Sequence, residues 1–109
     1  MLDKVEIFEQ IAGKYGKEYI LRQLAEECSE LSQAALKYIR ANRKETPMRI
    51  DEAIEHLTEE IADVRLMIDA VSATVLTWRD VDAMQAIKEQ KLARWKERMV
   101  DGDMDEDRW

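Results

Sequence analysis

Glycine and proline are nearly absent from this chain, which contains three glycines and one proline in 109 residues. The residues that most favour helix, namely Ala, Leu, Glu, Lys, Gln and Arg, are abundant throughout. No segment alternates apolar and polar residues between turn signals, as a half-buried strand would. The sequence therefore predicts an all-α protein, and its length is that of a single domain with its own core.

Apolar residues recur three and four positions apart, which is the spacing of one face of an α-helix. The pattern predicts helices at roughly 3–15, 18–41 and 47–76, and a fourth that follows Thr77 and ends near 100. Thr46 and Pro47 indicate an N-cap and a first turn for the third helix. Thr77 and Asp80 have the spacing of a capping box for the fourth. The expected architecture is bundle-like, with four helices.

The second and third helices have regular apolar stripes that we expect to be buried. The stripes comprise Leu24, Cys28, Leu31, Ala35 and Tyr38 in the second helix, and Ile54, Leu57, Ile61, Val64, Ile68, Val71 and Val75 in the third. Helices of this length extend about 35–45 Å, too far for so small a globule to cover alone. Association with further copies would bury the excess apolar surface, so a homodimer or homotetramer is expected.

The charge is acidic and concentrated at one end of the chain. The formal net charge is −7, and residues 101–109 include five acidic side chains, so a disordered tail is predicted there after a domain at 1–100. This balance argues against nucleic acids and anionic membranes as partners. A single cysteine, no signal-peptide pattern and no apolar run of ~20 residues favour a soluble, cytoplasmic protein.

Four carboxylates lie in two pairs with helical spacing. Glu27 and Glu30 are three residues apart in the second helix, as are Glu60 and Asp63 in the third. Residues at i and i+3 share a helix face, so two packed helices would bring the pairs together. No Lys or Arg stands three or four residues from any of the four. Such an oxygen-rich cluster is the kind that Mg²⁺ or Mn²⁺ selects.

The alternative interpretation is that these are ordinary solvated acids on helix surfaces. Other metals fit the sequence less well than Mg²⁺. A single histidine, His56, and no thiol cluster disfavour zinc. A carboxylate-bridged di-iron bundle uses Glu-x-x-His, whereas Ala53 stands three residues before His56.

Basic residues gather on the fourth helix. Lys91 and Arg94, with Lys88 and Arg98 nearby, could hold phosphate oxygens, a role suited to the planar guanidinium group of arginine. The other interpretation is a solvated surface, because cations near a helix C-terminus also favour its dipole.

Both motifs together resemble the MazG-like, all-α nucleotide pyrophosphohydrolase superfamily. Its E-E-x-x-E motif matches Glu26-Glu27-Cys28-Ser29-Glu30, and its E-x-x-D motif matches Glu60-Ile61-Ala62-Asp63. The resemblance covers about residues 5–100 and implies hydrolysis of a nucleoside triphosphate, a deoxynucleotide in the first instance, to the monophosphate and pyrophosphate.

Carried over by position, the resemblance implies that Glu27, Glu30, Glu60 and Asp63 are metal ligands and that Glu26 positions or deprotonates the attacking water. The dCTP-directed branch has a further signature on its last helix that is missing here. Its absence leaves Lys91 and Arg94 as substrate-binding candidates and the base and sugar preference open. Phosphoribosyl-ATP, the substrate of another branch, ranks lower. The rival hypothesis is a non-catalytic helical dimerisation or adaptor module.

Overall fold

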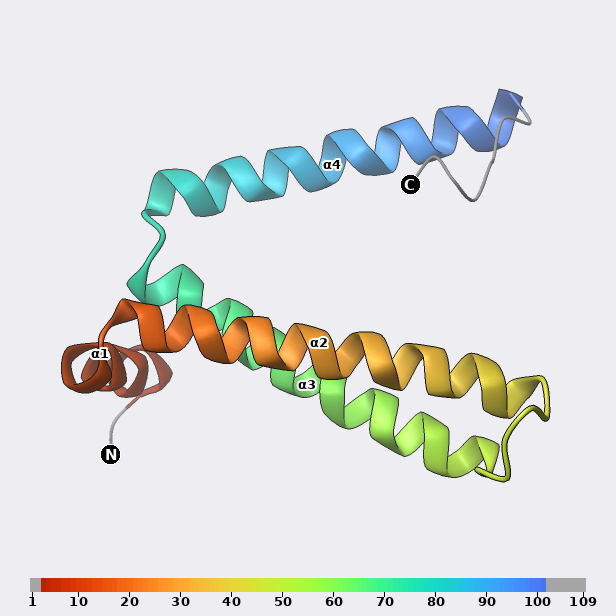
Figure 1. Cartoon of the computed structure of the whole chain (residues 1–109). Coiled ribbons are helices and arrows are strands. Elements are labelled where there is room, and N and C mark those ends of the chain that lie inside the picture. Colours follow the sequence, from red (N-terminus) through yellow and green to blue (C-terminus); the bar gives the residue numbers. More distant parts are fainter. Residues whose placement is uncertain (1–2, 102–109) are drawn as a thin grey trace. The chain divides into compact units, whose positions relative to one another are not determined.

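A computed structural model of the chain describes residues 3–101, which form four α-helices and no strand. These helices are α1 (Lys4–Tyr15), α2 (Lys17–Asn42), α3 (Ile50–Thr74) and α4 (Trp78–Asp101) (Figure 1). The all-α prediction is confirmed. The bounds of α1, α2 and α4 also agree with the sequence pattern, whereas α3 begins three residues later than expected.

The chain divides into two units, one ending at Val75 and the other beginning at Leu76. The first unit contains α1, α2 and α3, and the second contains α4. The prediction of one domain at 1–100 stays a prediction. Apart from Asp101, which closes α4, the predicted tail at 101–109 lies outside the described residues.

In the first unit, α1 packs against the α2–α3 pair at the end away from the 43–49 loop (Figure 1). Its N-terminus is capped by the side chain of Asp3, which accepts a hydrogen bond from the backbone N–H of Glu6 at 2.8 Å. It ends at Gly16, whose φ of 91° lies in the region that favours glycine. The resulting turn brings Phe8 against Ile20 and Ala70, the buried core of this unit.

The buried line between α2 and α3 differs from the predicted stripes. On α2 the buried residues are Ile20, Ala34 and Ala41, at multiples of seven, and on α3 they include Ala53 and Val64. Cys28, Ile54, Ile61 and Ile68 are exposed instead, so their predicted burial is wrong for the single chain. Both helices have apolar residues on more than one side, and helical spacing alone does not tell which side meets the neighbour.

The second unit begins with the predicted capping box, which is confirmed. The backbone N–H and the hydroxyl of Thr77 donate to Asp80 Oδ2 at 2.8 and 3.0 Å, and the Asp80 N–H donates to Thr77 Oγ1 at 3.3 Å. These bonds lower the pKa of Asp80. Helix α4 has no buried residue. Among the described residues, no helix is long and apolar enough to cross a membrane.

Candidate metal centre

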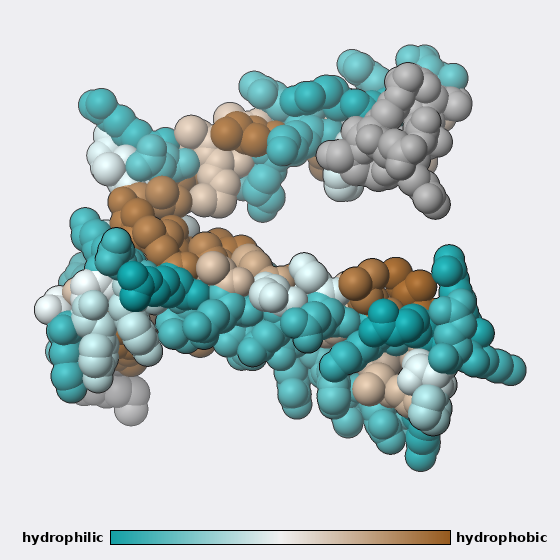
Figure 2. All heavy atoms as spheres, in the orientation of Figure 1, coloured by the Kyte–Doolittle hydropathy of each residue, from teal (hydrophilic) through white to brown (hydrophobic). Residues whose placement is uncertain are grey.

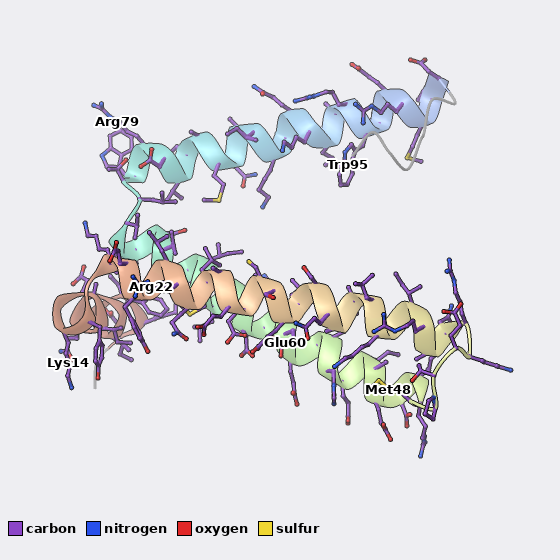
Figure 3. All side chains as sticks on the ribbon, in the orientation of Figure 1. Lys14, Arg22, Met48, Glu60, Arg79 and Trp95 are labelled. Carbon is purple, nitrogen blue, oxygen red and sulfur yellow. The ribbon has the colours of Figure 1, made fainter. Side chains whose placement is uncertain are left out.

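Three of the four predicted metal ligands converge between α2 and α3. Glu27, Glu30 and Glu60 each offer a carboxylate oxygen, and these three oxygens lie within 4.8 Å of one another. Glu60, labelled in Figure 3, lies on α3 beside α2. Residues far apart in sequence therefore share one small region because α2 and α3 pack along their length.

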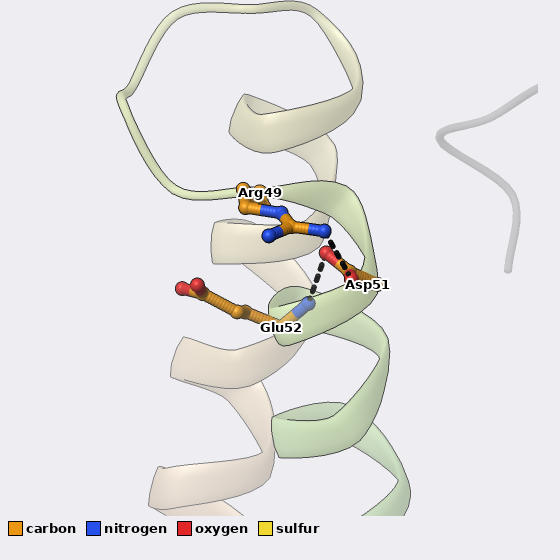
Figure 4. Close-up of polar contacts among 3 residues, drawn as sticks. All are labelled: Arg49, Asp51 and Glu52. Carbon is orange, nitrogen blue, oxygen red and sulfur yellow. Dashed lines mark hydrogen bonds and ion pairs between the residues drawn. The ribbon is translucent and has the colours of Figure 1, made fainter.

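The connection between α2 and α3 and the first turn of α3 determine which residues of the two helices lie side by side. Lys44 ends the preceding turn with a positive φ of 59°, and Glu45 N–H donates to the carbonyl of Arg40 at 2.9 Å. At the start of α3, Arg49 pairs with Asp51 at 2.8 Å, and Asp51 Oδ1 accepts from the Glu52 N–H (Figure 4). The predicted cap at Thr46 is therefore wrong.

The hydrogen bond of Thr46 explains why the N-cap predicted at this residue is wrong. Its hydroxyl accepts a long hydrogen bond of 3.4 Å from the Met48 N–H, which is a turn rather than a helix start. The carbonyl of Arg49 instead accepts the first helical bond, from the Ala53 N–H at 3.0 Å. Acidic Asp51 and Glu52 in the first turn favour this start because they complement the helix dipole.

Two carboxylate oxygens of the cluster are enclosed. Glu27 Oε2 and Glu60 Oε2 are removed from solvent and accept no hydrogen bond, although each residue as a whole is only half-buried. The ion pairs Lys4–Asp69, Arg22–Glu18 and Arg49–Asp51 do not involve the cluster, so none of these three neutralises it. Enclosed, unpaired carboxylates that face one another disfavour full ionisation.

The electrostatic consequence falls on Glu27. Burial, followed by the charge of Glu30, raises the pKa of Glu27 to about 7, with further contributions from Glu60 and Asp63. Without a cation, the cluster therefore retains a proton at pH values where an exposed glutamate is ionised.

The remaining predicted site residues lie in different settings. Asp63 is exposed on α3, close enough to raise the pKa of Glu27 but outside the group of three converging oxygens. Glu26 is exposed on α2 beside Glu27. Lys91 and Arg94 are exposed on α4, which belongs to the other unit.

Lys91 lines a shallow surface hollow of about 380 Å³ on α4, together with Lys88, Leu92 and Trp95. Because residues of one helix form this hollow, it is a groove between neighbouring side chains rather than an enclosed binding pocket. Sequence reasoning placed these basic residues on one helix correctly. It could not say where that helix lies relative to the acids.

The donor set fits a divalent cation of the hard, oxygen-binding type. The cluster supplies carboxylate oxygens only, and its two enclosed oxygens have no donor to satisfy them. A cation held by Glu27, Glu30 and Glu60, with Asp63 alongside, would offset their mutual repulsion. His56 is exposed on α3 and is not a member of the group. The Mg²⁺ or Mn²⁺ expected from the sequence stays a prediction, for which carboxylate oxygens are suitable ligands.

Sequence reasoning missed the small residues that bracket the cluster. Glu27 is the second member of the line Ile20, Glu27, Ala34 and Ala41, in which every other member is buried. Ala53 stands seven residues before Glu60 and is also buried. The seven-residue spacing was the signal available in the sequence, because it marks positions that face a neighbouring helix. Glu27 and Glu60 stand at such positions, and each is half-buried.

Comparisons of the chain with protein-family models, with curated proteins and with solved structures each find no match. The resemblance to the MazG-like superfamily therefore rests on the two motifs alone.

Proposed function

We propose that the protein is a Mg²⁺-dependent nucleoside triphosphate pyrophosphohydrolase of the MazG-like kind, with Mn²⁺ as an alternative cation. The observation that supports this most is the convergence of Glu27, Glu30 and Glu60, two of which have enclosed oxygens without a hydrogen-bond donor. Carboxylates in such positions are costly unless a cation neutralises them.

In this proposal, Glu27, Glu30, Glu60 and Asp63 hold the cation. When bound there, the cation would neutralise charge at the phosphates and lower the pKa of bound water. The carboxylates of the chain fix the position of the triphosphate relative to α2 and α3. Because α2 and α3 are regular helices packed on each other, this geometry is set before substrate arrives.

The reaction is a substitution at phosphorus. A water oxygen forms a bond to the α-phosphorus while the bond from that phosphorus to the bridging β-oxygen breaks, and pyrophosphate leaves with the electron pair. Glu26, exposed beside Glu27, receives the proton of the attacking water or orients it. Lys91 and Arg94 of α4 contact phosphate oxygens. The active protein is a homodimer or homotetramer.

The alternative function is a non-catalytic helical dimerisation or adaptor module. The observation that favours it is the exposure of Ile54, Ile61 and Ile68 along one side of α3. The two functions respond differently to ligands in a thermal melt. Millimolar Mg²⁺ with a nucleoside triphosphate should stabilise the hydrolase by mass action and leave an adaptor almost unchanged.

The direct test is a screen for pyrophosphate release from deoxynucleoside and ribonucleoside triphosphates, with phosphoribosyl-ATP as a further substrate. We expect wild-type protein to release pyrophosphate with Mg²⁺, and Glu60→Gln to lose at least ~100-fold of this activity because a ligand is removed. Glu55→Gln is the matched control, since Glu55 is exposed on the same helix. Its activity should equal wild type.

Equal release from wild-type and Glu60→Gln proteins would remove the hydrolase proposal. Release from neither protein with any triphosphate in the panel would favour the adaptor module instead.

A further inference from the structure

The carboxylates lie on one side of the α2–α3 pair, which we call the carboxylate side. On α2, Glu26 and Glu30 turn to this side of the line along which the two helices pack. Figure 2 shows hydrophilic surface over the near side of the pair, and Figure 3, in the same orientation, labels Glu60 there. Helices α1, α2 and α3 form the first unit, so the positions of their residues relative to one another do not depend on α4.

Two further residues of α2 share the direction of these acids. Tyr19 and Lys37 stand 18 residues apart, which is five full helical turns, so they project in the same direction. Glu26 and Glu30 lie between them, each within about 20° of that direction at 100° per residue. Tyr19 precedes Glu26 by about two turns, and Lys37 follows Glu30 by about two turns. We call these four residues the α2 line, and its acids lie midway between an aromatic ring and an ammonium group.

The aromatic end of the α2 line is a pair of exposed tyrosines. The rings of Tyr15 and Tyr19 lie 5.0 Å apart, and the two residues are 56% and 41% exposed. The ammonium group of Lys14 lies 5.1 Å from the centre of the Tyr15 ring. Neither tyrosine belongs to the core around Phe8. An exposed aromatic ring is a surface on which a nucleobase stacks, whatever the base, because every base has a π-face.

The other end of the α2 line is Lys37, which is exposed. Because α2 continues for five residues beyond Lys37, this cation stands before the last turn, where the helix dipole would favour it. Lys37 takes no part in the ion pairs of Lys4, Arg22 and Arg49. Side chains lean toward the N-terminus of their helix, so the ammonium group of Lys37 leans toward the carboxylates. Lys37 therefore stands where a cation contacts phosphate oxygens that extend beyond a metal held there.

We propose that the α2 line binds the nucleotide in one direction, with the base stacked on Tyr19 and the terminal phosphate at Lys37. The ligand is a nucleoside triphosphate whose base is recognised by its ring face. Its base and its terminal phosphate lie on opposite sides of the α-phosphate, as Tyr19 and Lys37 lie on opposite sides of the acids. In the reverse direction the base would meet the ammonium group of Lys37 and no exposed aromatic ring of this line.

The direction rests on the proposed function, because the ligand is the proposed substrate. It gives the two products of hydrolysis different places on the α2 line. The nucleoside monophosphate keeps the base and contacts Tyr19, whereas pyrophosphate keeps the terminal phosphate and contacts Lys37. Neither product is consumed by the reaction, so the binding of each can be measured alone.

The test is the binding of deoxyadenosine monophosphate and of inorganic pyrophosphate, each with Mg²⁺, to the full-length protein by calorimetry. Tyr19→Ala should weaken binding of the monophosphate by roughly 10-fold, the contribution of one stacked base, and leave pyrophosphate binding unchanged. Lys37→Gln should have the opposite effect. It should weaken pyrophosphate binding by roughly 10-fold, because a charged hydrogen bond to phosphate is lost, and leave the monophosphate unchanged.

Two matched controls accompany these variants. Tyr19→Phe retains the ring and should bind the monophosphate as wild type does. Lys17→Gln removes a cation that is exposed on the opposite side of α2 from Lys37, and it should bind both products as wild type does. If circular dichroism shows that Tyr19→Ala does not fold, Tyr19→Leu replaces it, because leucine retains apolar bulk without an aromatic ring.

An exchanged pattern, in which Tyr19→Ala weakens pyrophosphate binding and Lys37→Gln weakens monophosphate binding, would reverse the direction. The proposal is also overturned if either variant leaves both products unaffected or weakens both alike, or if wild type binds neither product. Failure of the hydrolase proposal gives a different result. The two separate losses of affinity, without pyrophosphate release from any triphosphate, would keep the direction and remove hydrolysis.

Discussion

Two sides of the α2–α3 pair are built by the same helices but carry different side chains. On one side, carboxylates converge between the helices, and two of their oxygens have no hydrogen-bond donor. On the other side, Ile54, Ile61 and Ile68 of α3 are exposed. Positions that differ by one or three residues along the same helix therefore have opposite chemical character. Between the two sides lies the seam, where α2 packs against α3.

The largest effect on the unfolding free energy is expected from a substitution in the buried core. Ile20→Ala removes a fully buried side chain that packs against Phe8 and Ala70. The loss of transfer free energy plus a cavity should destabilise the fold by about 2–5 kcal/mol. Denaturant unfolding followed by circular dichroism, at fixed protein concentration, measures this free energy.

Leu36→Ala is the control, because Leu36 is 53% exposed on α2, away from the seam. Its change in unfolding free energy should be at most about 0.5 kcal/mol. If the two substitutions cost the same, the core does not lie where the structure places it.

A smaller effect on stability is expected from the carboxylate cluster, through the pH dependence of the melting temperature. The pKa of Glu27 is about 7 in the folded chain, above the ordinary value of 4.5, so the folded state holds a proton that the unfolded state has released between these values. The resulting stability is fully present below pH 4.5 and is lost as the pH rises through 7. Metal-free protein should therefore melt at a lower temperature at pH 8 than at pH 5.

Comparison with Glu27→Gln isolates this contribution. The variant has no carboxyl at this position, so its melting temperature should fall less between pH 5 and pH 8 in the presence of a chelator. Parallel pH profiles for wild type and Glu27→Gln would show that the cluster does not hold a proton.

Much of the fold follows from the sequence. The scarcity of glycine and proline predicts helix, and the hydrogen bonds between Thr77 and Asp80 confirm the capping box at the start of α4. The i, i+3 spacing predicts four converging carboxylates, and three of them, Glu27, Glu30 and Glu60, have oxygens within 4.8 Å of one another. These features are local, or depend only on two helices packing side by side.

What the sequence could not predict depends on choices between competing local options. A helix could start at Thr46-Pro47 or at Arg49-Asp51. The structure has the second start, where Arg49 forms an ion pair with Asp51 and the acidic side chain of Asp51 complements the helix dipole. Helices α2 and α3 each offer two apolar rows, and small residues such as Ala34 and Ala53 decided which row faces the neighbour. A small side chain lets two helices approach closely, a property that hydrophobic periodicity does not weigh.

The position of the basic residues is a different matter. Lys91 and Arg94 belong to the second unit of the chain, whereas the carboxylates belong to the first. Their role as phosphate contacts stays a prediction. The capping box at Thr77 determines where α4 begins along the chain. It does not determine whether Lys91 and Arg94 lie near a bound substrate.

The central claim is that the carboxylates of α2 and α3 together bind a divalent cation. Free Mn²⁺ measured by electron paramagnetic resonance during titration tests it most directly, with Mg²⁺ added as competitor. Wild-type and Glu55→Gln proteins should bind Mn²⁺ saturably and equally, and Glu60→Gln should bind it at least ~10-fold more weakly. Equal binding by Glu60→Gln and wild type, or no saturable binding by wild type, would contradict the account.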